Sequence, residues 1–193
     1  VTAAEPVPAV PSLVVVITID QFRGDYLARY REHFVPGGFR LLLEQGANFT
    51  DCRYRHAVTK TAAGHAVVLT GVHANQHGII NNAWVDRATL KRVDCVEDDT
   101  VQLLGCAETM RGVRPPAVLA PKGASPWRLL TTTVGDELKM ARGGHSKVIG
   151  ISGKNRSGIL LAGKLADAVY WMDRGRIVTS THYMKEIPAW VRT

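Results

Sequence analysis

The feature that most constrains the fold is a continuous apolar run near the N-terminus, residues 13–19, which reads LVVVITI. A run that is apolar at every position, rather than at alternate positions, is typical of a parallel strand buried on both faces. Segments of helical and strand character alternate after it, and a chain of 193 residues that is 46% hydrophobic can form one real core. We therefore predict an α/β fold with a mainly parallel central sheet and helices on both faces.

The chain divides into a short tail and one larger region. Residues 1–12 are rich in Pro and Ala and do not begin with Met, so we interpret them as a mature N-terminus after signal removal, in a periplasmic or secreted protein. Residues 13–193 contain no linker or repeat and are expected to belong to one domain. Within them, residues 86–126 are charged and irregular, which indicates a surface excursion and a candidate lid. No segment is long and apolar enough to predict a membrane span.

Hydrophobic spacing and glycines place the other elements. Helices are expected over residues 23–34, 39–45, 61–69 and 131–141, and from residue 157 to 161. Strands are expected over residues 48–55, 147–152, 168–171 and 177–183, and a loop entering a short strand over residues 77–84. Gly46 and Gly71 are expected to end two of the helices.

The charge of the chain favours anionic ligands. The formal net charge is +7 and the pI is about 9.6, which attracts phosphate esters, nucleic acid or an acidic membrane face. There is no dense basic block, and aromatic residues make up only 7% of the chain, so stacking platforms for single strands are not expected. General attraction of phosphate therefore fits better than nucleic-acid recognition.

The three cysteines, Cys52, Cys95 and Cys106, form no CxxC pair, which argues against a zinc knuckle. Cys95 and Cys106 flank a short polar loop and are either a disulfide, as suits an exported protein, or two unpaired thiols. Cys52 is then the odd cysteine, and we expect it to be a small buried group.

Candidate functional residues fall at strand ends and helix starts: Asp20, Thr61, Asn82, and the pair Lys154 and Arg156. In open α/β sheets, ligands bind at the edge where strands end. Taken singly, each residue has an ordinary role as a helix cap, a turn residue or a surface charge. Taken together, they supply a nucleophile, a metal-binding carboxylate and donors for phosphoryl oxygens, which favours phosphoryl transfer.

Several stretches resemble motifs of the alkaline phosphatase superfamily, in the branch shared with type I phosphodiesterases and nucleotide pyrophosphatases. Residues 15–27 resemble the first metal motif, and residues 59–71 resemble the threonine nucleophile motif. Residues 77–84 resemble the loop with a phosphate-binding Asn, and residues 152–157 resemble a Lys-x-Arg motif. The Lys-x-Arg motif is similar to that of the exported Thr-nucleophile alkaline phosphatases, the monoesterases of the branch. The likeness runs from about Leu13 to Trp190.

The resemblance implies a two-zinc mechanism. Asp20 and Thr61 would contact one zinc, and the phosphoryl group of a phosphate monoester would move to Thr61 as a covalent intermediate. Asn82, Lys154 and Arg156 would hold the phosphate oxygens. His65 lies in the nucleophile motif, where we expect it to pack or bond the helix start, while His73 and His77 are expected to be loop residues.

The sequence departs from the family in its metal ligands. The family supplies the others from an Asp-x-x-x-His motif, an Asp-His pair and a late His, and none of these patterns occurs in the 193 residues. Two zincs need six or more protein ligands, and Asp20 with Thr61 gives two. We therefore expect the chain to be the N-terminal portion of an alkaline phosphatase-like domain, nearly inactive alone, with the remainder of the polypeptide needed to complete the metal site.

Two other functions stay open. A phosphodiesterase or nucleotide pyrophosphatase of the same branch would share most motifs, although it is not expected to carry Lys154 and Arg156. A non-catalytic anion-binding module would use the same basic charge and helix N-terminus. A sulfatase is not expected, because no Cys or Ser stands at the position of Thr61.

Overall fold

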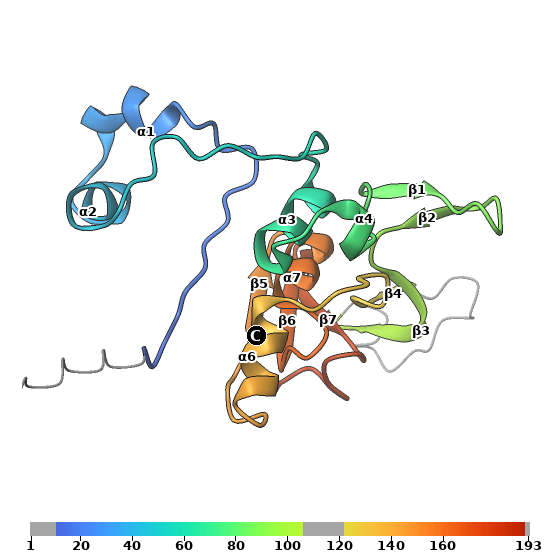
Figure 1. Ribbon diagram of the computed structural model, residues 1–193. Helices are drawn as coiled ribbons and strands as arrows, with labels where there is room; N and C mark the ends of the chain where they lie inside the picture. Colours follow the sequence, from blue (N-terminus) through green and yellow to red (C-terminus); the bar gives the residue numbers. More distant parts are fainter. Residues whose placement is uncertain (1–10, 106–121, 192–193) are drawn as a thin grey trace, which may run out of the picture. The chain divides into compact units, whose positions relative to one another are not determined.

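A computed structural model describes residues 11–105 and 122–191, and the chain divides into two compact units, residues 1–52 and 53–193 (Figure 1). Each unit is described by itself below. Cys106 and the tail up to residue 10 lie outside the described residues. Among the helices that are described, none combines the length and the apolar character needed to cross a bilayer.

The first unit is built around aromatic side chains. Its helices are α1, the 3-10 helix η1, and α2, at Tyr26–Arg29, Arg31–His33 and Gly38–Gln45. The ring of Phe39 lies 5.3 Å from that of Phe22 and 5.2 Å from that of Phe34, measured between centroids. No residue of the three helices is buried, so these ring contacts take the place of an aliphatic core.

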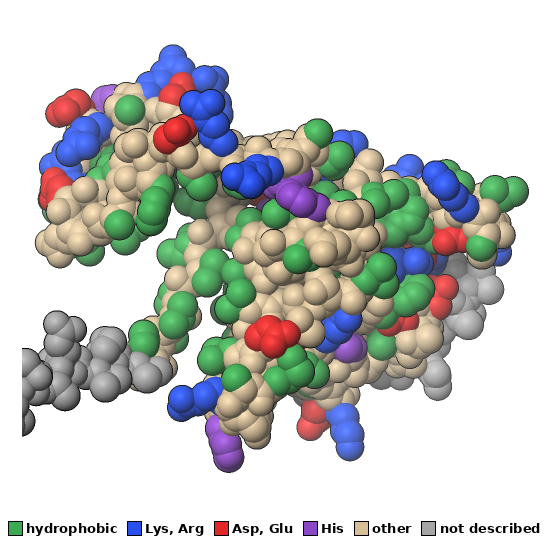
Figure 2. Space-filling view, viewed as in Figure 1, with side chains coloured by type: hydrophobic (Ala, Val, Ile, Leu, Met, Phe, Trp, Pro, Cys, Tyr) green, Lys and Arg blue, Asp and Glu red, His purple; other side chains and the backbone are tan. Residues whose placement is uncertain are grey.

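The apolar run over residues 13–19 does not form the predicted strand. It pairs with no strand in the described part of the chain, and its side chains are exposed, with Leu13 at 76% and Ile17 at 74% (Figure 2). An apolar composition indicates that side chains favour burial. A strand also needs a neighbouring strand whose backbone exchanges hydrogen bonds with its own. The prediction of a central strand here is wrong for this structure.

Other predictions in the first unit hold in part. The expected helix over residues 23–34 is split at Tyr30, which leaves the helical region and lets Phe34 turn back onto Phe39. The helix over residues 39–45 is confirmed as α2. Gly46 ends it with an extended backbone rather than a left-handed one, and a Cβ there would meet the carbonyl oxygen of Leu42 at 2.5 Å. Residues 48–55 form no strand.

The second unit carries most of the secondary structure. Its helices are α3 (Thr61–Thr70), α4 (Ala74–His77), α6 (Val134–Ala141), α7 (Asn155–Ala162) and the 3-10 helix η2 (Ala189–Val191). Its strands are β1 (Ala83–Val85), β2 (Arg92–Asp94), β3 (Glu97–Leu104), β4 (Lys122–Ala124), β5 (Ile149–Ser152), β6 (Ala168–Asp173) and β7 (Arg176–Ser180).

Five of these strands form one open sheet in the order β4-β3-β7-β6-β5, and β1 pairs with β2 in a separate ribbon. The α/β class is confirmed. The described strands pair mostly antiparallel, however, and parallel pairing is confined to β5 and β6, so this part of the sheet differs from the mainly parallel one predicted. Antiparallel pairing arises because β6 and β7 form a hairpin and β3 joins the edge of β7.

The β6–β7 hairpin turns on Arg174 and Gly175, which both have positive φ values, of 47° and 78°. A two-residue loop of this kind matches the right-handed twist of the strands it joins. Trp171 and Val178 face each other across the hairpin and are both buried, which fixes the register.

The described residues of the range 86–126 are more regular than predicted. Strands β2, β3 and β4 all fall in this range, although β3 begins with acidic residues that disfavour strands. Asp98 is nevertheless 7% exposed, because its carboxylate accepts hydrogen bonds from Ser125 and Thr100. Tertiary hydrogen bonds therefore override the local preference, and the role of this range as a lid stays a prediction.

Helix α6 begins with a reciprocal capping box. The Thr133 hydroxyl accepts from the Asp136 backbone N–H, and the Asp136 carboxylate accepts from the Thr133 backbone N–H at 2.9 Å. The other Asp136 oxygen accepts from the Leu165 N–H at 2.6 Å, which ties α6 to the segment after α7. Asp136 is fully buried, so these bonds satisfy a charge that would otherwise be costly.

Candidate functional site

Thr61 is the first residue of α3, at the helix start where the sequence placed it, and its role as a nucleophile stays a prediction. The N-cap position belongs to Lys60, whose side chain makes no capping hydrogen bond, so the alternative role of Thr61 as an N-cap residue is not what the structure has. Ala62 and Ala66 are fully buried, which holds the helix in the core. Helix N-termini offer backbone N–H donors and partial positive charge to anions.

Asn82 reaches the same helix from another part of the chain. Its Oδ1 accepts a hydrogen bond from the Ala62 N–H at 2.9 Å, and so fills the place that a cap side chain would take. Its own N–H donates to Asn81 Oδ1 at 2.8 Å. Of the two neighbouring asparagines, Asn82 is therefore the one whose side chain bonds to the helix of Thr61.

The backbone of Asn82 is anchored as well. Its carbonyl accepts from the Cys95 N–H at 3.0 Å, which continues the β1–β2 ladder by one residue. Cys95 is fully buried, and burial raises the pKa of its thiol to about 12; the neighbouring Asp94 carboxylate raises it further, while the charge of Arg156 opposes the shift. Cys95 is a free thiol here, protonated at neutral pH, and Cys52 is exposed rather than buried as predicted.

Lys154 and Arg156 stand at the start of α7, directly after β5, as predicted. Lys154 is the N-cap residue, and its carbonyl accepts from the Ser152 hydroxyl at 2.7 Å. The Nε atom of Arg156 is buried and has no hydrogen-bond partner within the described residues. A buried donor without an acceptor destabilises a fold by about 1–3 kcal/mol. An anion bound beside Arg156 could supply the missing acceptor.

The parts that carry these residues pack together. Helix α7 lies against β5 and β6, and α3 packs on α7 (Figure 1). The charge of Arg156 acts on the Cys95 thiol, and Cys95 is bonded to Asn82, which is bonded to the first turn of α3. Asn82 is thus hydrogen-bonded to the first turn of the helix that begins with Thr61, and that helix packs on α7, which carries Arg156.

The histidines divide into two groups. His65 has the predicted structural role, since its Nδ1 donates to the Thr61 carbonyl at 2.7 Å. His77 is not a loop residue, because it ends α4 and is fully buried. Its Nδ1 accepts from the Ile79 N–H, and burial lowers the pKa of its imidazole, with the charges of His56 and His73 acting in the same direction.

A zinc site is not formed by the described residues. Asp20 is exposed and belongs to the first unit, whereas Thr61 belongs to the second. No group of three or more His, Cys, Asp or Glu able to hold a metal occurs among residues 11–105 and 122–191. The residues present therefore do not fit a two-zinc centre by themselves, and the role of Asp20 stays a prediction.

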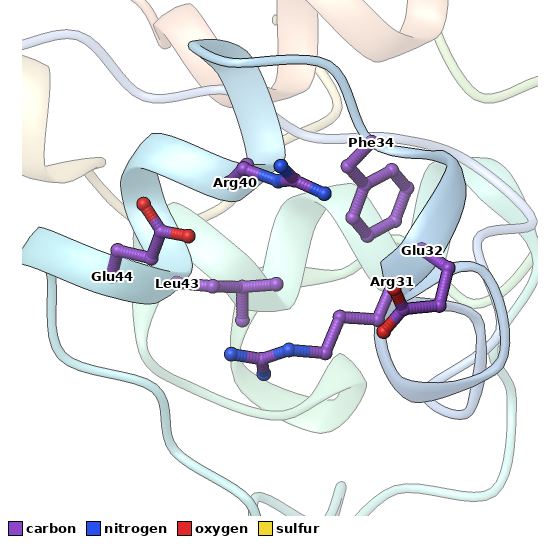
Figure 3. Close-up of a pocket in the computed structure, with 6 residues that line it drawn as sticks. All are labelled: Arg31, Glu32, Phe34, Arg40, Leu43 and Glu44. Carbon is purple, nitrogen blue, oxygen red and sulfur yellow. The ribbon is translucent and has the colours of Figure 1, made fainter.

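The first unit has a small, partly open hollow of its own. Figure 3 shows the residues that line it: Arg31 and Glu32 on η1, Phe34 directly after η1, and Arg40, Leu43 and Glu44 on α2. None of the residues predicted to bind phosphate lines it.

Comparison with known proteins identifies the family. Residues 14–154 match the family model described as type I phosphodiesterase / nucleotide pyrophosphatase. The chain belongs to this family, within the alkaline phosphatase superfamily. The predicted resemblance is confirmed.

Individual relatives are similar over nearly the whole chain. It is 39% identical to alkaline phosphatase PafA of Elizabethkingia meningoseptica and 40% identical to alkaline phosphatase PhoV of Synechococcus elongatus. It is also 40% identical to a protein of Myroides odoratus named calcium-transporting ATPase. Each alignment covers 94% of this chain but only 31–32% of the relative, so the chain spans about a third of their length.

Solved structures give the same result for the fold. A crystal structure of wild-type PafA matches with a TM-score of 0.79 at 38% identity, and covers 89% of this chain and 32% of that chain. A second PafA structure, substituted at one threonine, one asparagine, one lysine and one arginine, matches with a TM-score of 0.79 at 36% identity. The alkaline phosphatase-like fold predicted from the sequence is confirmed.

Proposed function

We propose that this chain carries the nucleophile and phosphate-binding part of an alkaline phosphatase, which hydrolyses phosphate monoesters through a phosphothreonine at Thr61. The observation that carries the proposal is the 2.9 Å hydrogen bond between Asn82 Oδ1 and the Ala62 N–H. It holds an asparagine amide beside the first turn of the helix that begins with Thr61. The substituted PafA structure adds support, because it alters the same four residue types at matching threonine–asparagine and lysine–arginine spacings.

In the proposed reaction, Thr61 Oγ forms a bond to phosphorus as the ester P–O bond breaks and the alcohol leaves with a proton. Water then cleaves the phosphothreonine and releases phosphate. Asn82 Nδ2 donates to one phosphoryl oxygen. Arg156 can donate to two phosphoryl oxygens at once, and Lys154 supplies a positive point charge. These donors stabilise the charge that spreads over the phosphoryl oxygens in the transition state.

The proposal that the enzyme uses zinc rests only on the resemblance to the family. When bound, it would lower the pKa of the attacking hydroxyl, with Asp20 and Thr61 among its ligands. We propose that the other ligands come from polypeptide beyond these residues, so that the 193-residue chain alone is nearly inactive. A periplasmic or secreted location is part of the same proposal.

The main alternative is a phosphodiesterase or nucleotide pyrophosphatase of the same family. Lys154 and Arg156 favour the monoesterase, because a monoester offers one more free oxygen and more charge for them to hold than a diester. The test compares an aryl phosphate with its methyl diester in the full-length enzyme. We expect kcat/KM to favour the monoester, and the preference to shrink at least tenfold in Arg156→Met but not in Arg176→Met. A diester preference that Arg156→Met leaves unchanged would contradict the proposal.

The second alternative is an anion-binding module without catalysis. Replacing Thr61 by Ala separates the two, since a catalyst loses turnover and keeps phosphate binding. A protein with no turnover in either form, and with unchanged phosphate affinity, would be a binding module.

A further inference from the structure

We infer that Arg128, held against Trp84 and Trp127, binds a second anionic group on the substrate, a carboxylate or a further phosphate. The inference rests on the proposed function and narrows it to phosphate monoesters whose leaving group is itself negatively charged.

The first observation is the fixed geometry of these side chains. The guanidinium carbon of Arg128 lies 4.1 Å from the centre of the Trp127 ring and 5.9 Å from that of Trp84. Trp127 is 54% exposed, yet its indole N–H donates to the Glu97 carbonyl at 2.8 Å. An exposed aromatic ring that a hydrogen bond holds in place keeps the stacked guanidinium oriented, so that little conformational entropy is lost when a ligand binds.

The second observation is that Arg128 has no acceptor. Its Nε is buried without a hydrogen-bond partner, and in the described part of the chain it makes no ion pair. The charge of Arg128 acts on the Asp86 carboxylate, but the two form no ion pair, and Asp86 Oδ1 accepts from the Ala88 N–H, the Thr89 N–H and the Thr89 hydroxyl instead. Among the described side chains, the two arginines with an orphaned Nε are Arg128 and Arg156. Arg156 is proposed to hold the phosphoryl group, and Arg128 is in the same unsatisfied state.

The third observation is where the group formed by Arg128, Trp84 and Trp127 lies relative to Asn82. The Asn82 carbonyl accepts from the Cys95 N–H, which continues the register in which Trp84 pairs with Val93. Side chains two residues apart along such a ladder point to the same face, about 7 Å apart. Trp84 therefore lies two residues along the chain from Asn82, whose side chain accepts from the first turn of α3.

The chemistry of the site fits an anionic group that presents two oxygens. A guanidinium that stacks on indole rings through its faces presents its N–H donors at its edge, where a carboxylate or phosphate accepts two hydrogen bonds. A neutral leaving group would gain nothing from this contact. Charge-assisted hydrogen bonds are worth about 1.5–3 kcal/mol, so a second anionic group should improve binding by at least about tenfold.

The test measures binding by calorimetry in the full-length protein at constant salt. The probes are propylphosphonate, which carries one anionic group, and phosphonoalkanoates of increasing length, from phosphonoacetate to phosphonopentanoate. We expect one length to bind at least tenfold more tightly than propylphosphonate, and the advantage to disappear in Arg128→Gln. Arg87→Gln removes an exposed charge from the neighbouring turn and should keep the advantage.

The outcomes separate a failure of this inference from a failure of the proposed function. Equal binding of propylphosphonate and every phosphonoalkanoate would overturn this inference and leave the proposed function standing. An advantage that survives Arg128→Gln, or is lost equally in Arg87→Gln, would also overturn it. Failure of all the phosphonates to bind would contradict the proposed phosphate site as well. If Arg128→Gln does not fold by circular dichroism, Trp127→Leu replaces it, since losing the stacked ring should reduce the advantage too.

Discussion

Asn82 offers the sharpest single perturbation, because its two amide atoms have different roles. Oδ1 accepts from the Ala62 N–H, which is a structural contact, while Nδ2 is proposed to donate to phosphate. Asn82→Ala removes both. Asn82→Asp keeps an acceptor for Ala62 and replaces the donor with a negatively charged oxygen. The two variants should therefore differ in stability and agree in loss of function.

The size of the stability effect follows from the contact. Ala62 is fully buried and Lys60 provides no capping acceptor, so Asn82→Ala leaves a helix N–H without its partner. Losing a capping hydrogen bond costs about 1 kcal/mol, or about 3 °C in Tm for a unit of this size. Asn82→Asp should cost less than Asn82→Ala, because a carboxylate beside a helix N-terminus contributes about 0.3–1 kcal/mol.

The assay is thermal unfolding followed by circular dichroism, together with kcat/KM for an aryl phosphate in the full-length enzyme. Both variants should lose at least about tenfold in kcat/KM, while only Asn82→Ala should lose about 3 °C. Asn75→Ala, at an exposed position of α4, serves as the control and should change neither value. Equal destabilisation by Ala and Asp would refute the structural role, and full activity in either would refute the role in phosphate binding.

Three further predictions concern stability and reactivity. Because burial lowers the pKa of His77, the unfolded chain takes up its proton first, so the free energy of unfolding should fall as pH drops below about 6.5; an equal slope in His77→Asn would contradict this. Asp136→Ala should cost about 2 kcal/mol in urea unfolding, because it removes the acceptor of the buried Thr133 N–H and of the partly buried Leu165 N–H; a cost below about 1 kcal/mol would refute it. In a Cys106→Ser background, Cys52 should react with a thiol reagent at neutral pH and Cys95 only after unfolding; rapid reaction of both native thiols would overturn it.

The sequence predicted those parts of the molecule whose signals are local. Helix α3 follows from small and apolar residues closed by Gly71, which adopts the left-handed conformation expected of a helix-ending glycine. Helix α7 and strand β5 follow from their hydrophobic spacing, so Lys154 and Arg156 could be placed at the end of a strand. The family resemblance rested on the same local motifs.

The parts that the sequence did not predict depend on distant partners. Residues 13–19 have the composition of a buried strand, but composition does not say which backbone will pair with them. Strand β3 was missed because its acidic residues disfavour a strand locally. Its stability depends on a distant partner, the Ser125 hydroxyl, which donates to the Asp98 carboxylate. Arg128 carried no motif, and only the packing of two tryptophans against it drew attention to it.

The central claim is that Thr61 receives the phosphoryl group, and trapping that intermediate tests it most directly. The full-length enzyme would be mixed with an aryl phosphate, quenched in acid within the first turnovers, digested and examined by mass spectrometry. We predict a phosphothreonine at Thr61 that decays as free phosphate is released and that is absent from Thr61→Ala, which should also lose turnover. Steady turnover by Thr61→Ala, or a phosphorylated residue elsewhere in the chain, would contradict the account.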